Sequence, residues 1–345
     1  MASMNLPPSH DTVLKLFLRG SRTPNNKYPN VSLGGQTVLV TGSNSGIGLA
    51  CAHILPTLGV SHLILAVRST IKGEEAATPI RKAHPGTKVE VWELDMLSYP
   101  SIQAFARKCA TLPRIDIAIL NAGVSSGSVS KINASTGHEE TFQVNYFSTA
   151  LLSLLLLPVL KPKSSDRYDQ PGRLTIVGSG MGLLSTFENR NTVPLIPSFD
   201  VPFSGFQAAG ERYAVTKTLV MMLVHKLSEA VDADDVIVNT VEPGFTSGTA
   251  LHRDYSWAGK ISMALMKKFL SRTPEQAAWT YLDAAAVKGR ESHGGFVMFW
   301  EVFPFHQMMH TREGKQTMER LWDETMAELE FAGVRQILES IRRKQ

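Results

Sequence analysis

The sequence predicts a doubly wound α/β fold, and two observations carry that prediction. From residue 36 onward, short apolar runs rich in β-branched residues alternate with segments of helical periodicity. That alternation is typical of a parallel sheet with helices on both faces. The first strand-like run, at residues 37–41, leads through glycines into a helical pattern. Because such sheets bind ligands beyond the carboxyl ends of their strands, we expect the functional site at that edge.

The apolar runs predict a seven-stranded, all-parallel sheet of the Rossmann type in a single domain. Helical segments lie between most of these runs, so both faces of the sheet would be covered. The strands are expected at residues 37–41, 62–67, 88–93, 115–120, 173–178, 235–241 and 295–299.

Residues 1–35 are expected to form an N-terminal arm, and residues 36–345 the domain. A short amphipathic helix at residues 12–18 of the arm is expected to pack on the domain rather than on a membrane. A minimal doubly wound domain does not need two of the stretches in this chain, residues 183–210 and 246–270. Both follow the end of a predicted strand. We expect them to cover the substrate. The tail after residue 318 is predicted to be one amphipathic helix docked on the domain.

Composition excludes several classes of protein. The chain has 345 residues, of which 43% are hydrophobic and 19% charged, as in an ordinary soluble globule. Thirty-five basic and 31 acidic side chains give a net charge of only +4, without a basic block, so nucleic-acid binding is not indicated.

Cysteine usage and hydropathy indicate the compartment. Cys51 and Cys109 are the two cysteines, and no Cys/His cluster has metal-ligand spacing, so neither a disulfide framework nor a metal site is expected. The first ten residues lack the features of a signal peptide. The apolar run at residues 150–160 contains Ser153 and Pro158 and is too short to span a bilayer. We predict a cytoplasmic protein without a transmembrane segment.

The glycine-rich turn after the first predicted strand is suited to binding a phosphate. Backbone N–H groups at a helix start attract anions, and glycines let a pyrophosphate approach closely. Glycine also serves tight turns for geometry alone, and the spacing here, G-x-x-x-G-x-G, differs from G-x-G-x-x-G. The candidate residues are Gly42, Ser43, Asn44, Ser45, Gly46, Ile47 and Gly48.

Arg68, after the second predicted strand, favours NADP(H) over NAD(H). A basic residue at this point accommodates a 2′-phosphate, whereas an acidic residue binds the ribose hydroxyl. Lys72 is a weaker helper in the same pocket, and the alternative for Arg68 is a solvated surface residue. Asp95 and Met96 end the third strand, where the carboxylate is suited to the adenine amino group or to capping a helix.

Two further groups of residues follow predicted strands. Asn121, Ala122 and Gly123 close the fourth strand, where small residues let the backbone pass close to the adenine ribose. Asn145 lies early in the following helix and is expected to hold a water on Lys217, a residue further along the chain.

Tyr213 and Lys217 form the most informative pair. An i, i+4 spacing sets the phenol and the ammonium on one helix face. A free tyrosine has a pKa near 10, and a nearby cation lowers that value, which makes a usable proton donor. Ser179, at the end of the fifth strand, is suited to bind the same substrate oxygen. Tyrosine and lysine at this spacing are common on helices, so the pair gains its meaning from the strand-end residues in consistent order.

Together these motifs resemble the short-chain dehydrogenase/reductase family over residues 36–300, and within it the retinol-dehydrogenase-like branch. The resemblance implies that Tyr213 is the acid/base, that Lys217 binds the nicotinamide ribose, that Ser179 orients the carbonyl and that Asn145 completes a proton relay. It also implies that the nicotinamide end is cradled by Pro243, Gly244, Phe245 and Thr246.

The chain departs from the family pattern around Ser179. The usual paired serines are replaced by Gly178-Ser179-Gly180, so the assignment of Ser179 depends on its position after the strand. Tyr213 follows Ser179 after 34 residues (213 − 179), a longer link than is usual. The insertion is rich in large apolar side chains, which either line a roomy substrate pocket or pack in the core. The apolar helices at residues 151–157 and 215–227 indicate either a homodimer interface or burial against the sheet.

The function predicted is NADPH-dependent reduction of a bulky apolar ketone or aldehyde, reversible with oxidation of the secondary alcohol. The ketoreductase would act on a retinoid-, steroid-, polyketide- or terpenoid-like carbonyl, as enzymes of secondary metabolism do. Two alternatives remain open at this point: reduction of a C=C bond by the same fold, and an NADP(H)-binding sensor or interaction protein without turnover.

Overall fold

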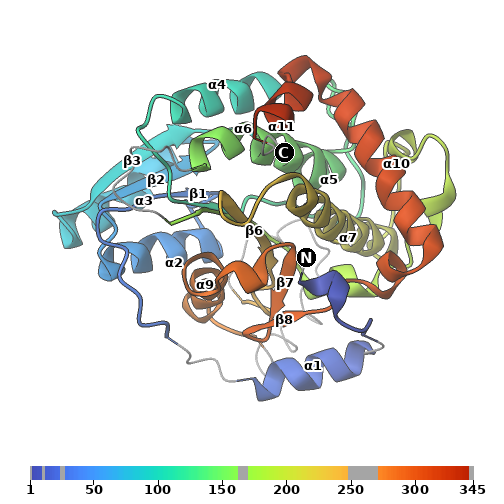
Figure 1. Ribbon diagram of the computed structural model, residues 1–345, viewed down its shortest axis with the longest axis horizontal. Coiled ribbons are helices and arrows are strands. Elements are labelled where there is room, and N and C mark those ends of the chain that lie inside the picture. The colour runs from blue at the N-terminus through green and yellow to red at the C-terminus, as the bar shows by residue number, and fades with distance from the viewer. Residues whose placement is uncertain (1, 10–11, 24–27, 162–169, 248–270, 342–345) are drawn as a thin grey trace.

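A single sheet organises the protein (Figure 1). The computed structural model describes residues 2–9, 12–23, 28–161, 170–247 and 271–341. Within these ranges the strand order is β3-β2-β1-β4-β5-β6-β7-β8, and the first seven strands are parallel, close to the predicted bounds. They are β1 (Thr37–Thr41), β2 (His62–Val67), β3 (Lys88–Glu93), β4 (Ile117–Leu120), β5 (Gly172–Val177), β6 (Val236–Val241) and β7 (Gly295–Met298).

The seven predicted parallel strands are confirmed, and the sheet has an eighth strand that was not predicted. β8 (Glu301–Phe303) pairs antiparallel with β7 and forms the edge. The hairpin turn consists of Phe299 and Trp300, both with positive φ, at 56° and 67°. Two-residue hairpins are usually signalled by Asn or Gly at these positions, so this aromatic turn gave no signal in the sequence.

Helices cover both faces of the sheet, as predicted. Strand order reverses between β1 and β4, the switch point where doubly wound folds bind ligands. On one face lie α2 (Gly46–Ile54), α3 (Thr70–Ala83) and α9 (Pro274–Leu282). On the other lie α4 (Tyr99–Cys109), α5 (Glu140–Phe142), α6 (Thr149–Leu160), α7 (Phe206–Ala230), α10 (Arg312–Glu328) and α11 (Val334–Ile341).

Polar residues at the helix starts fix where these helices begin. Ser69 accepts a hydrogen bond from the backbone N–H of Lys72 at the start of α3, and Ser98 does the same for α4. α9 begins with a reciprocal capping box between Thr273 and Gln276.

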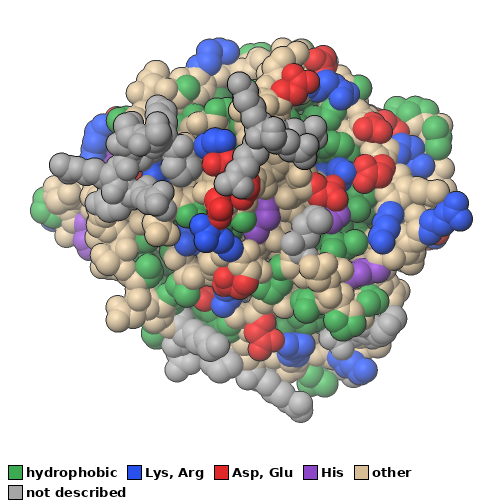
Figure 2. Space-filling model, in the orientation of Figure 1, with side chains coloured by type: hydrophobic (Ala, Val, Ile, Leu, Met, Phe, Trp, Pro, Cys, Tyr) green, Lys and Arg blue, Asp and Glu red, His purple; other side chains and the backbone are tan. Residues whose placement is uncertain are grey.

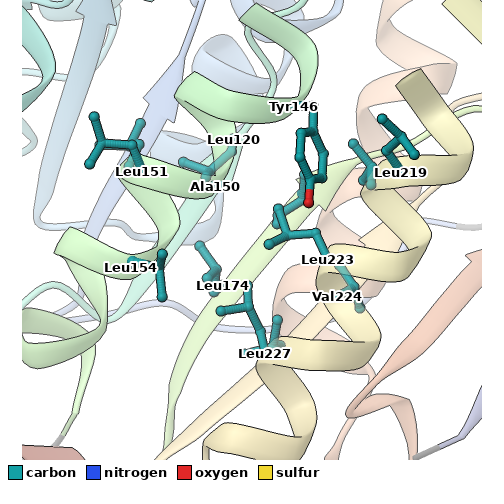
Figure 3. Close-up of a cluster of buried hydrophobic side chains, with 14 of the residues drawn as sticks. Leu120, Tyr146, Ala150, Leu151, Leu154, Leu174, Leu219, Leu223, Val224 and Leu227 are labelled. Carbon is teal, nitrogen blue, oxygen red and sulfur yellow. The ribbon is translucent and has the colours of Figure 1, made fainter. Parts of the chain in front are cut away.

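The largest core lies between α6, α7 and the sheet (Figure 3). Side chains from the two helices point toward one another over Leu120 of β4 and Leu174 of β5. All are essentially inaccessible to solvent, so the pair of helices is fixed firmly against the strands. The side chains labelled in the figure are Leu120, Tyr146, Ala150, Leu151, Leu154, Leu174, Leu219, Leu223, Val224 and Leu227.

The apolar surfaces of α6 and α7, on which the homodimer prediction depends, are buried within this chain. α11 packs on α6 and α10 packs on α7, where Lys226 bonds both carboxylate oxygens of Glu319 at 2.9 Å. The tail is therefore two helices, not the one predicted, and the break falls at Gly333, whose φ is +67°. Burial in the fold, the alternative to a dimer, accounts for the apolar sequence of α6 and α7.

The apolar run at residues 150–160 belongs to a longer helical stretch than expected. α5, a π-helical turn at Gln143–Ser148 and α6 form one stretch, Glu140–Leu160, whose 21 residues are long and apolar enough to cross a membrane by composition. Its most apolar window is 83% buried inside the protein. The stretch is thus a core helix of this fold.

The N-terminal arm is fastened to the β7–β8 hairpin. Ser3 donates its hydroxyl proton to the carbonyl of Phe303 at 2.5 Å and accepts the N–H of Phe296 at 2.7 Å. α1 (Val13–Arg22) begins at the cap Thr12, and its Arg19 forms an ion pair with Glu301 at 3.0 Å. The helix expected in the arm therefore packs on the domain, as Figure 1 shows at the hairpin.

The insertion at residues 183–210 is held down by carboxylates of neighbouring helices. Glu324 of α10 accepts the backbone N–H groups of Leu195 and Ile196, both at 2.8 Å. Phe187 and Phe199 are fully buried, and Phe199 stacks on a core phenylalanine with ring centroids 4.3 Å apart. Core packing therefore explains these two aromatics better than a substrate pocket does. Most of the second expected cover, residues 246–270, lies outside the described residues.

Charges are mixed on the surface. On the face drawn in Figure 2, Lys and Arg side chains alternate with Asp and Glu, and no continuous basic band gathers there. This distribution agrees with the small net charge of +4.

Candidate active site

The glycine turn joins β1 to α2, at the carboxyl edge of the sheet. Gly42 and Gly46 have positive φ, at 65° and 58°, which side chains rarely adopt. A Cβ at Gly48 would lie 2.5 Å from Nδ2 of Asn121, so this position has no room for a side chain. Ser45, the cap of α2, makes no side-chain hydrogen bond to the helix. The N–H groups of the first turn are thus left for a ligand.

Within the turn, Ser43 has a structural role for its side chain. It is fully buried and donates to the carbonyl of Val40 at 3.0 Å, so only its backbone is suited to a ligand. Asn44, Ser45 and Ile47 keep accessible surface.

Asn121 links β4 to the turn. Its Nδ2 donates to the carbonyl of Thr41 at 2.8 Å, and the backbone N–H of Ala122 donates to Oγ1 of Thr41 at 2.9 Å. The Asn121 amide is oriented by Tyr281 of α9, whose hydroxyl donates to Oδ1 at 2.9 Å. Tyr281 was missed in the sequence, because a tyrosine inside a helical pattern gives no sign that it reaches a strand end.

Arg68 directly follows β2, Lys72 lies in the first turn of α3, and both side chains are exposed. The N–H of Gly42 donates to the carbonyl of Ala66 at 2.8 Å, which connects this strand end to the turn. The two cations are therefore accessible to a bound anion.

Asp95 and Met96 follow β3. Asp95 accepts the N–H of Leu97 through Oδ1 at 3.0 Å, which orders the turn before α4, while the cap of α4 is Ser98. Met96 is buried, and its carbonyl accepts the hydroxyl of Ser148 at 2.5 Å. The alternative role considered for Asp95, capping the helix, therefore belongs to Ser98.

Lys217 is a buried cation on α7. It is 6% exposed, and Nζ donates to the carbonyl of Val177 at 2.8 Å. Burial lowers the pKa of the ammonium to about 8. The same Nζ lies 5.7 Å from the centroid of the Tyr213 ring and would be 3.7 Å from a Cβ at Gly123. Lys217 thus lies near the Tyr213 ring, at the ends of β4 and β5.

Ser179 begins the turn after β5 and is fixed against α7. Its Oγ accepts the N–H of Met181 at 3.2 Å, and Thr218, next to the lysine, donates to the carbonyl of Gly182 at 2.7 Å. A Cβ at Gly178 would lie 2.6 Å from Oγ1 of Thr240 on β6. The departure from paired serines therefore has a steric cause.

Asn145 lies in the π-helical turn, where its side chain holds the segment after Gly123. Oδ1 accepts the N–H of Val124 at 2.9 Å, while Nδ2 donates to the carbonyl of Val124 at 2.8 Å and to Thr216 at 3.1 Å. A water relay through this side chain would have to share these hydrogen bonds. A π turn inside a helix is often found at functional sites.

The turn after β6 brings together two charged residues that the sequence did not single out. Pro243 and Gly244 begin the turn, and Thr246 donates to the carbonyl of Gly244 at 2.9 Å. Glu242 accepts backbone hydrogen bonds from Gly180 and Gly244, and burial raises the pKa of its carboxyl although the charge of Arg272 opposes that rise. Buried charges carry no periodic signature, which is why both were missed.

Phe245 and Thr246 anchor the chain that returns to α9. Thr246 pairs with Arg272 as neighbouring parallel backbone, and the N–H of Arg272 donates to the carbonyl of Phe245 at 2.8 Å.

Comparison with known proteins identifies the family. A family model described as short chain dehydrogenase matches residues 36–190. Short chain dehydrogenase/reductase mfmJ of Annulohypoxylon moriforme is 45% identical over 346 residues, covering 99% of each chain. Short chain dehydrogenase virL of Hypocrea virens is 41% identical over 336 residues, covering 96% of each. The chain therefore belongs to the short-chain dehydrogenase/reductase family and is an oxidoreductase.

Solved structures agree in fold. The Pseudomonas aeruginosa RhlG/NADP active-site complex has a TM-score of 0.55 at 22% identity, covering 82% of this chain and 99% of that one. The resemblance to the retinol-dehydrogenase-like branch remains a prediction.

Proposed function

We propose that the protein is an NADPH-dependent reductase of a bulky apolar ketone or aldehyde, with Tyr213 as proton donor. The observation that carries the proposal is the buried ammonium of Lys217, 5.7 Å from the Tyr213 ring and bonded to the strand end that leads into Ser179. A cation beside a phenol stabilises the phenolate, so the phenol gives up its proton nearer neutral pH. The same residues serve the reverse oxidation of the secondary alcohol.

The glycine turn and β2 fit NADP(H). Glycines allow close approach of a pyrophosphate, and the first N–H groups of α2 are not taken by a cap. Arg68 and Lys72, which follow β2, are exposed and supply positive charge for a 2′-phosphate. The RhlG/NADP complex of the same fold supports this choice of cofactor. When bound, the nicotinamide supplies the hydride.

The chain's own residues handle the proton and the developing charge. The hydroxyl of Ser179 accepts the N–H of Met181, which leaves its own proton for the substrate oxygen. Tyr213 donates the proton to that oxygen, and Lys217 stabilises the phenolate that remains. Asn145 holds the segment beyond Gly123 against the lysine. This arrangement concentrates donors on one developing oxyanion.

The substrate is proposed to be an extended carbonyl compound with a polar far end. A cavity of about 690 Å³ lies between the insertion and the start of α10, and Leu183 and Leu184 are among its lining residues. Its lining combines these side chains with polar ones such as His306 and Arg190. Ser179, Tyr213 and Lys217 do not line the cavity, so we place only the far part of the substrate there. The fungal relatives mfmJ and virL make secondary metabolism a fitting setting, with the enzyme in the cytoplasm.

The test is NADPH oxidation, followed by absorbance, with a panel of apolar ketones, aldehydes and conjugated enones. We expect turnover with a ketone or aldehyde. Turnover confined to the C=C bond of enones would contradict carbonyl reduction, and NADPH binding without turnover on the whole panel would favour the sensor alternative.

A substitution of Arg68 tests the preference for NADPH over NADH. Arg68→Ala should weaken NADPH binding at least tenfold and leave NADH binding within twofold, because only NADPH carries the 2′-phosphate. Equal losses for both cofactors would remove the proposed role of Arg68.

A further inference from the structure

Arg272 is a buried cation whose guanidinium has no acceptor within the described residues. The residue is 5% exposed and directly precedes the cap of α9. Within residues 2–9, 12–23, 28–161, 170–247 and 271–341, no ion pair or side-chain hydrogen bond involves its five N–H donors. Burial lowers the pKa of Arg272, and the charge of Glu242 opposes that effect. Buried guanidinium groups in proteins are normally hydrogen-bonded, so this one requires an explanation.

Glu242 balances the charge of Arg272 without using its donors. The carboxylate accepts hydrogen bonds from the backbone N–H groups of Gly180 and Gly244. A carboxylate near the guanidinium makes the buried charge tolerable. Among the described residues, however, no hydrogen bond or ion pair joins the two side chains, and Glu242 acts on Arg272 through its charge alone. The donors of Arg272 therefore remain for another acceptor.

The position of Arg272 points to the cofactor. Its side chain packs on Gly244, where an added Cβ would lie 2.9 Å from Cδ, 3.1 Å from Nε and 3.1 Å from Nη1. Its backbone is paired with Thr246, beyond the carboxyl end of β6.

The glycine turn lies at the same edge of the sheet and on the same face. It follows the carboxyl end of β1 and opens α2, and α2 packs directly against α9, which Arg272 precedes (Figure 1). The start of α9 is closed by its own capping box, whereas the start of α2 is not capped by a side chain. Arg272, which precedes α9, therefore lies at the same edge of the sheet as the open N–H groups of α2.

We infer that Arg272 is a cofactor-binding residue whose guanidinium donates to the pyrophosphate of the bound dinucleotide, opposite the N–H groups of α2. This inference rests on the proposed dinucleotide cofactor. Two groups then supply positive charge to the pyrophosphate: the start of α2 and the buried guanidinium of Arg272. Guanidinium groups bind phosphate oxygens through paired N–H donors, which a lysine cannot reproduce. The role of Arg272 thus differs from that of Arg68, which would contact only the 2′-phosphate.

Binding measurements test this inference without requiring turnover. Titration calorimetry with NADPH, NADH and ADP-ribose is applied to the wild type and to Arg272→Met. We expect a loss of tenfold to a hundredfold in affinity for all three ligands, because each contains the pyrophosphate and a charge-assisted hydrogen bond is at stake. Arg272→Lys, which retains the charge and most of the packing, should recover part of the loss.

The matched control is Arg173→Met. Arg173 is also a guanidinium whose pKa burial lowers, but it begins β5 at the opposite edge of the sheet and donates to the carbonyl of Lys288 at 2.5 Å. Its loss should cost stability and leave all three affinities within twofold.

Three results would overturn the inference. Affinities unchanged in Arg272→Met would mean that the arginine is purely structural. If Arg272→Met bound NADPH and NADH more weakly but ADP-ribose as tightly as the wild type, Arg272 would contact the nicotinamide end of the cofactor and not the pyrophosphate. An equal loss in Arg173→Met would attribute the effect to instability. A wild type that binds the cofactor but reduces no carbonyl would refute the proposed function and leave this inference standing.

Discussion

Replacing Lys217 by methionine should make the cofactor-free protein more stable. The pKa of this lysine is lowered from its usual value of 10.5 to about 8 by burial, so the unfolded chain binds the proton more tightly than the folded one. At about 1.4 kcal/mol per pKa unit, the buried charge costs about 3 kcal/mol at pH 7. The cost is full below pH 8 and disappears as the pH rises toward 10.5.

The net effect also includes a lost hydrogen bond. Lys217 donates to the carbonyl of Val177 at 2.8 Å, and losing that bond costs about 1 to 1.5 kcal/mol. The free energy of unfolding of Lys217→Met should therefore exceed that of the wild type by roughly 2 kcal/mol at pH 7, and the difference should fall to about zero near pH 9.5. The same substitution should lower kcat at least a hundredfold. Urea unfolding at the two pH values measures the stability, and NADPH oxidation measures the activity.

Lys226→Met on the same helix is the control. Lys226 binds Glu229 and Glu319, and these carboxylates outweigh the effect of burial and raise its pKa. Its loss should destabilise the protein slightly, by less than about 1 kcal/mol, equally at both pH values. If Lys217→Met were instead destabilising, and by the same amount at pH 7 and pH 9.5, then the lysine would not be a buried cation and the electrostatic basis of the site would be wrong.

Two further substitutions address the cofactor turn and the insertion. Gly48→Ala would set a Cβ 2.5 Å from Nδ2 of Asn121, so we expect at least tenfold weaker NADPH binding by calorimetry; unchanged affinity would contradict the close packing of the turn. Burial lowers the pKa of His138, but Asp200 at 2.9 Å and Glu328 at 3.3 Å outweigh it and raise the pKa above its usual 6.5, so the stability it contributes is full below pH 6.5 and is lost as pH rises through the folded pKa. His138→Gln should therefore lose more unfolding free energy at pH 6 than at pH 8 in urea titrations, and equal losses would refute the ion-pair assignment.

The parallel strands were predictable because burial on both faces imposes continuous apolar, β-branched runs. All seven runs became strands close to the expected bounds. β8 was not predictable in this way, because three residues after an aromatic turn carry neither alternation nor a glycine signal. The sequence of the tail predicts one helix, because its apolar periodicity continues past Gly333, where the chain turns.

Some residues of the candidate site could also be predicted from the sequence, and others could not. Tyr213 and Lys217 could be paired from sequence because helical spacing fixes their common face. In the structure Lys217 lies beside the Tyr213 ring and donates to the end of β5. Glu242 and Arg272 could not be singled out from the sequence, since their burial and their closeness to one another arise only in the tertiary structure. The aromatics of the insertion were equally ambiguous, and Phe199 belongs to the core.

The central claim is that Tyr213 delivers the proton to a carbonyl reduced with NADPH. Its most direct test is Tyr213→Phe, which removes one hydroxyl and keeps the ring beside Lys217. We predict that kcat for the best ketone of the panel falls at least a hundredfold, while the Kd for NADPH, measured by calorimetry, stays within threefold of the wild type. Turnover by Tyr213→Phe at the wild-type rate would contradict the account.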